Sequence, residues 1–187
     1  MTESVVLTDP ATAFRGVAGQ LATPVAVVMT LLDGMPAAAT ISSVVAASWQ
    51  PPLLAIMLRR GSGIEAALGA SGRFTVNVLG EADHALARRW ARPGRERSWD
   101  AFADVPLRRR DPLPPLLTGA VVWTDCVVAQ SFIVGDHRCI VGEVVAADRN
   151  HEAAPLVYYR GRFRGLGPGL APAAWSLADT TELAASW

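Results

Sequence analysis

Hydrophobic runs along this chain are short, and turn-forming residues separate them in the manner of antiparallel strands. The run 25–32 is rich in β-branched residues and ends at Asp33-Gly34, a hairpin signal, so residues 37–42 are expected to return beside it. Residues 53–58 are apolar throughout, which predicts a strand buried on both faces. The remaining predicted strands are 74–79, 120–134, 139–147 and 156–163. A tight turn at 135–137 would join the two longest of them.

Short helices are predicted at three places, namely 10–21, 62–68 and 81–90. The first has Asp9 as N-cap and Pro10 in its first turn, and Phe14, Val17 and Leu21 recur at helical spacing. Ser62 can cap the second helix. The segment 93–115 is rich in Arg, Asp and Pro, so it is expected to be mostly a surface excursion with one helical turn near 98–102.

Six or seven strands with short helices and hairpin spacing predict a mainly β protein built as an antiparallel barrel, in preference to a doubly wound sheet. A chain of 187 residues, 51% of them hydrophobic, is suited to one domain. We place that domain at residues 1–166. Residues 167–187 form a tail rich in Gly, Pro and Ala with no core element, expected to be extended or docked on a neighbouring subunit.

The charge balance, the length of the apolar runs and the cysteine content argue against several classes of partner and site. Seventeen basic and seventeen acidic residues cancel, which argues against a nucleic-acid partner. The apolar runs are far shorter than the ~20 residues of a membrane helix, and the start of the chain lacks the pattern of a secretory signal. We therefore expect a cytoplasmic protein without a membrane partner. Cys126 and Cys139 are too few for a zinc motif or a disulfide framework, so we expect buried, inert thiols and no metal site.

Two clusters could hold a charged small molecule against a sheet. Thr40, Ser42 and Ser43 lie at a predicted strand end, where hydroxyl and N–H groups could bond a heterocycle or a phosphate. Taken alone, they are better explained as hydroxyls that satisfy their own backbone. Arg59, Arg60 and Ser62 combine cations, a hydroxyl and a helix start, as anion binding requires, although a solvated arginine pair is the simpler interpretation.

Two single residues are further candidates. Asn77 lies among apolar neighbours in a predicted strand, so its amide is either a backbone brace or a ligand contact. His137 follows Asp136 on the turn between the two long strands. It is either an exposed turn residue or a group that donates to, or packs on, a ligand ring. The sequence has no glycine-rich dinucleotide fingerprint and no cluster of metal ligands.

The order of these signals resembles that of the flavin reductase family with the FMN-binding split-barrel fold, the small components of two-component flavin monooxygenases. The resemblance runs from about residue 14 to residue 166. Its cues are 14–15, 21–28, 39–43 with Pro51-Pro52, 72–79, 135–137, 141–144 and 156–163.

The resemblance implies an antiparallel split β-barrel that forms a homodimer with flavin in the groove between subunits. It implies an NAD(P)H-dependent flavin reductase that uses FMN or FAD with NADH or NADPH and supplies reduced flavin to a partner monooxygenase. Two alternatives stay open: a split-barrel protein that binds flavin or haem without reductase turnover, and a self-contained flavin oxidase or oxygenase.

The resemblance also assigns roles to residues. Thr40, Ser42 and Ser43 would line the isoalloxazine and the ribityl chain, and Arg60 with Ser62 would hold the phosphate. Asn77 joins the predicted cofactor-binding residues, and His137 is placed at the nicotinamide side of the flavin as the candidate catalytic residue. Ile64 stands where family members often carry threonine, and Pro24 where glycine is common, so the phosphate contacts and the choice between FMN and FAD stay open.

Overall fold

The computed structural model describes residues 9–92, 94, 97–150 and 152–167, and its centre is one curved antiparallel sheet. The sheet has seven strands, in the spatial order β3 (Met35–Ile41), β2 (Ala26–Leu32), β6 (Arg73–Val78), β9 (Val122–Val134), β10 (His137–Arg149), β5 (Pro52–Arg59) and β4 (Val44–Trp49). The sheet curls until β3, at one end of the order, contacts β5, the next-to-last strand at the other end. The mainly β, antiparallel architecture predicted from the sequence is therefore confirmed.

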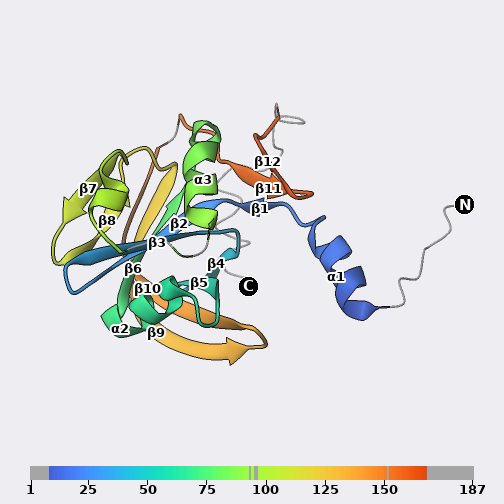
Figure 1. Cartoon of the computed structure of the whole chain (residues 1–187), viewed down its shortest axis with the longest axis horizontal. Helices are drawn as coiled ribbons and strands as arrows, with labels where there is room; N and C mark the ends of the chain where they lie inside the picture. Colours follow the sequence, from blue (N-terminus) through green and yellow to red (C-terminus); the bar gives the residue numbers. More distant parts are fainter. Residues whose placement is uncertain (1–8, 93, 95–96, 151, 168–187) are drawn as a thin grey trace, which may run out of the picture.

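Two smaller sheets and three helices surround this one (Figure 1). One small sheet has the order β1 (Thr23–Pro24), β11 (Val157–Tyr159), β12 (Arg162–Arg164), and the other pairs β7 (Leu107–Arg110) with β8 (Leu113–Leu117). The helices are α1 (Pro10–Ala18), α2 (Gly63–Ser71) and α3 (His84–Ala91), with 3-10 turns at Glu81–Asp83 and Asp100–Phe102. In Figure 1, α1 stands clear of the rest of the described chain.

The core consists of two apolar clusters that share β2. Ala26 and Val28 face the cluster that α2 covers, which includes Leu68 and Phe74. Val27 and Met29, on the other face of β2, join a second cluster with Trp90 of α3 and Leu117 of β8. Because both faces of β2 are covered, its first residues form a continuous apolar run and do not alternate with polar ones.

The hairpin between β2 and β3 has the turn that its sequence predicts. Asp33 and Gly34 have φ values of 53° and 72°, as a type I′ turn requires at both central positions. The turn sets a register in which Leu32 pairs with Met35 and Ala26 pairs with Ile41. This register carries the hydroxyl-rich segment after β3 to the open edge of the barrel.

Several predicted elements differ from the structure. The run 156–163 is a hairpin and not one strand, because Arg160 and Gly161 both have positive φ and turn the chain back on itself. The last part of 93–115, from Leu107 on, belongs to the β7–β8 hairpin, whose buried end joins the second cluster. The prediction of a β5 buried on both faces is wrong for this chain, since within 53–58 only Ile56 and Leu58 are buried. Strand β4 was not predicted.

Both cysteines are free and buried, as the sequence predicts, and burial raises the pKa of the Cys126 thiol to about 11. Within the described residues, no helix is long and apolar enough to cross a membrane. The same part of the chain holds no group of three or more His, Cys, Asp or Glu side chains placed to bind a metal. Apart from Gly167, the predicted tail lies outside the described residues.

Candidate flavin site

A groove opens where the end of β3 meets β5, the start of α2 and the β9–β10 turn, and we call it the barrel groove. Its volume is about 270 Å³. It brings together Thr40, Ser42, Ser43, Ser62 and His137, five of the seven residues to which the resemblance assigns a role. The other lining residues are Ala39, Ile41, Met57, Leu58, Arg59 and Ile64.

The three hydroxyl groups at the end of β3 differ in their hydrogen bonds. Thr40 Oγ1 donates to the carbonyl of Ala87 in α3 at 2.8 Å, and Ser43 Oγ donates to the carbonyl of Met57 at 3.1 Å. These two bonds hold the β3 end against α3 and β5. Ser42 is half-buried, and its hydroxyl has no partner among the described residues. Ser42 is therefore the hydroxyl most available to a ligand.

The start of α2 lines one end of the groove. Ser62 is the N-cap of this helix, and its Oγ accepts from the N–H of Glu65 at 3.4 Å. The first amides of a helix lack partners within the helix and point outward, which makes this position suited to a phosphate. Ile64 is buried in the first core cluster and supplies no hydroxyl. Any phosphate contact here therefore comes from backbone amides, Ser62 and cations.

The structure separates the two neighbouring arginines. Arg59 lines the groove, and the β5–β10 register places it opposite His137. Arg60 is not among the lining residues; its guanidinium donates to the carbonyl of Gly135 at 3.5 Å, and its N–H donates to the carbonyl of Asp136 at 3.0 Å. Successive residues at a strand end point to opposite sides, so Arg59 and not Arg60 reaches the groove.

His137 reaches the groove with one ring nitrogen already engaged. Its Nδ1 lies 2.8 Å from Asp136 Oδ1, and the hydrogen bond to His137 holds the pKa of the Asp136 carboxyl below its usual value. Because Nδ1 faces this carboxylate, Nε2 is the nitrogen left for a ligand. The side chain is half-exposed, at the lip of the groove.

Asn77 is a backbone brace and not part of the groove, which corrects the prediction of a cofactor contact. The side chain is fully buried. Its Nδ2 donates to the carbonyl of Val27 at 3.2 Å and to Thr75 Oγ1 at 3.1 Å, while its Oδ1 accepts from the N–H of Leu117 at 3.0 Å. The amide thus joins β2, β6 and β8, and no part of it is exposed to a ligand.

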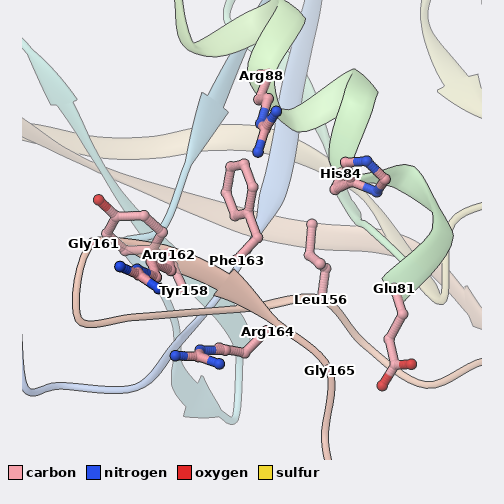
Figure 2. A pocket seen from close by; sticks show the side chains of 10 residues that line it. All are labelled: Glu81, His84, Arg88, Leu156, Tyr158, Gly161, Arg162, Phe163, Arg164 and Gly165. Carbon is pink, nitrogen blue, oxygen red and sulfur yellow. The ribbon is translucent and has the colours of Figure 1, made fainter.

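A larger cleft, of about 520 Å³, lies between α3 and the β11–β12 hairpin, and we call it the hairpin pocket. Figure 2 shows Phe163 pointing toward Arg88 of α3, whereas Arg164 points away on the other side of the strand. Glu81 already accepts from the N–H of Leu166. Arg88 and Arg164 therefore do not converge on one point of the hairpin pocket, as two cations that hold a phosphate would.

Comparison with known proteins points to one family. The model of the flavin reductase like domain matches residues 18–167. The chain belongs to this family. Its relatives include the reductase component of a 4-nitrophenol 4-monooxygenase/4-nitrocatechol 2-monooxygenase from Rhodococcus opacus. That protein is 39% identical over 150 residues, which cover 80% of this chain and 78% of the relative.

Solved structures of reductases from this family share the fold. An NADH:FAD oxidoreductase of Streptomyces globisporus superimposes with a TM-score of 0.81 at 28% identity, covering 90% of this chain and 100% of the other. The flavin reductase component of a bacterial two-component tryptophan halogenase gives a TM-score of 0.78 at 31% identity, covering 85% of this chain and 99% of that one. The family and fold expected from the order of the motifs are therefore confirmed.

The sequence named Arg59 and Arg60 as one anion-binding cluster, and the resemblance mapped the phosphate contact to Arg60, whereas Arg59 is the one that lines the groove. Beside the groove, sequence reasoning left out Glu65, whose carboxylate accepts from the N–H of Gly61 at 3.1 Å and from Arg138 Nε at 2.6 Å. A signal was present for Glu65, since Ser62 and Glu65 have the spacing of a capping box.

Proposed function

We propose that this chain is an NAD(P)H-dependent flavin reductase that reduces FMN or FAD in the barrel groove and releases the reduced flavin to a separate monooxygenase. The observation that carries the proposal is the convergence of the free Ser42 hydroxyl, the α2 N-terminus, Arg59 and His137 in one groove. Family membership and relatives named as reductase components support it.

The residues of the groove suit the two ends of a flavin nucleotide. When bound, the flavin would accept a hydride from the reduced nicotinamide, which is chemistry that the cofactors themselves supply. Ser42 would bond the polar edge of the ring, while Ser62, the α2 amides and Arg59 would hold the phosphate. His137 would orient the reductant through Nε2, while Asp136 fixes the ring on the other side.

We further propose that the active form is a homodimer. At about 270 Å³, the groove is smaller than the ~300–1,000 Å³ usual for ligand sites, so a second subunit would have to cover the rest of the flavin. Helix α1 has no buried residue, and Phe14, Val17 and Leu21 are 70%, 65% and 63% exposed. An apolar stripe of this kind needs a partner surface.

Residues 132–134, at the end of β9, are exposed and apolar, and they are the surface that we propose for this stripe. Phe14→Glu would place a charge in the proposed interface, and we expect light scattering to show a shift toward monomer with loss of flavin reduction. A wild-type chain that is monomeric at micromolar concentration with full activity would contradict the dimer.

A cytoplasmic location completes the proposal. Cys126 and Cys139 are free, which suits a reducing compartment, and reduced nicotinamide cofactors are available there. The proposed partner is a flavin-dependent monooxygenase that takes reduced flavin by diffusion.

One steady-state assay tests the proposal. Purified protein is supplied with NADH or NADPH and with FMN, FAD or riboflavin, and nicotinamide oxidation is followed by absorbance. We expect oxidation that depends on added flavin, and little flavin retained after gel filtration. Bound flavin or haem without turnover would favour a binding protein, and tightly retained flavin with oxidation of an organic substrate would favour a self-contained oxidase or oxygenase.

A further inference from the structure

An ion pair beside the barrel groove joins three elements that the proposed reaction uses. Glu65 Oε1 in α2 accepts from Arg138 Nε in β10 at 2.6 Å, and Oε2 accepts from the backbone N–H of Gly61 at 3.1 Å. The Glu65 and Arg138 side chains are 14% and 31% exposed. One carboxylate therefore ties the loop after β5, the first turn of α2 and the start of β10 together.

Each end of this link is adjacent to a residue of the groove. Gly61 lies in the loop between Arg59 and Ser62, at the proposed phosphate end, and Arg138 directly follows His137. Gly61 has a φ of 74°, a left-handed conformation that allows its N–H to turn toward the carboxylate. The link therefore spans from the phosphate loop to the turn that presents the imidazole.

The helix dipole favours the Glu65 carboxylate in the first turn of α2, but the same negative charge opposes a phosphate bound nearby. The hydrogen bond from Arg138 holds the pKa of Glu65 below its ordinary value, so the side chain is negative at neutral pH. A negative charge near an anion subsite repels a phosphate. Its presence is explained if the carboxylate shapes the loop, because a bond between charged groups is stronger and more directional than a neutral one.

We propose that Glu65 and Arg138 form a positioning bridge that sets the phosphate loop and the His137 turn relative to each other, so that flavin phosphate binding and nicotinamide binding both depend on it. The inference rests on the proposed function of the groove. Neither side chain lines the groove, so both act through neighbouring residues.

Single and double variants distinguish a positioning role of the two residues from a purely electrostatic one. Glu65→Gln removes a negative charge and Arg138→Gln removes a positive one, so a purely electrostatic role predicts tighter FMN binding in the first and weaker binding in the second. The positioning bridge predicts weaker binding in both. We expect the Kd for FMN, from quenching of flavin fluorescence, to rise about tenfold in each, with the Kd for riboflavin within about twofold of wild type.

The same variants are expected to raise the KM for NADH about threefold to tenfold, because the His137 turn loses its support. The double variant should be no worse than the poorer single one, since both remove the same link. Asp104→Asn is the matched control, because it breaks the exposed Arg89–Asp104 ion pair away from the groove and should change none of these values.

Three results would overturn the bridge: FMN affinities that move in opposite directions in the two single variants, an unchanged KM for NADH, or additive effects in the double variant. If Glu65→Gln lowers the melting temperature, Glu65→Asp is the second variant, because it keeps the negative charge on a shorter side chain. The positioning bridge then predicts weaker FMN binding, whereas a purely electrostatic role predicts unchanged FMN binding. A wild-type protein that neither binds flavin nor oxidises NADH would instead refute the proposed function itself.

Discussion

Replacing Asn77 with alanine tests whether this residue braces the barrel or contacts the cofactor. The side chain joins β2, β6 and β8 through hydrogen bonds to Val27, Thr75 and Leu117. A brace predicts a large loss of stability with unchanged flavin affinity in the protein that remains folded. A ligand contact predicts the reverse.

The expected loss can be worked from the three bonds. Asn77→Ala leaves the N–H of Leu117, a residue 3% exposed, without its acceptor, and an orphaned buried donor costs about 1–3 kcal/mol. The two bonds donated by Nδ2 contribute about 1 kcal/mol each. The sum is roughly 3–5 kcal/mol, which for a chain of this size lowers Tm by roughly 6–20 °C.

Thermal unfolding followed by circular dichroism measures the loss, and flavin fluorescence below the transition measures affinity. Asn150→Ala is the matched control, because Asn150 is exposed and its Oδ1 accepts one local bond from the N–H of Glu152. That control should stay within about 0.5 kcal/mol of wild type. A stable Asn77→Ala protein with weakened flavin binding would refute the brace.

Three further predictions concern the groove and the sheet. His137→Ala should raise the KM for NADH roughly tenfold with little change in the Kd for FMN, as one orienting hydrogen bond is worth ~1–3 kcal/mol; wild-type kinetics would make it a plain turn residue. Arg59→Ala should weaken FMN binding more than it weakens riboflavin binding, and more than Arg60→Ala weakens FMN binding. Fluorescence titrations with the opposite ranking of the two variants would assign the phosphate contact to Arg60. Gly142→Ala should destabilise the fold by about 1–3 kcal/mol or more, because the new Cβ would lie 2.5 Å from Cζ of the buried Phe74; an unchanged urea midpoint would show that the ring can move.

Local signals in the sequence were sufficient for features that depend on a few neighbouring residues. Asp33-Gly34 predicted a turn with two positive φ values, and Asp9 and Ser62 predicted helix starts, because each signal acts within four residues of itself. The order of such signals was also enough to identify the family, although no single motif was specific. The resemblance assigned Thr40, Ser42 and Ser43 to the flavin site, and in the structure all three line the barrel groove.

Only the tertiary structure decided features that depend on residues distant in the chain. Whether Asn77 meets a ligand or a strand depends on β8, whose Leu117 lies 40 residues away. The choice between Arg59 and Arg60 depends on which side of β5 faces the groove, and the role of Glu65 depends on Arg138, 73 residues away. A sequence shows which hydrogen bonds and ion pairs each side chain is able to form. The partner of a buried amide or carboxylate is set by which strands lie next to each other, and local sequence patterns do not determine that order.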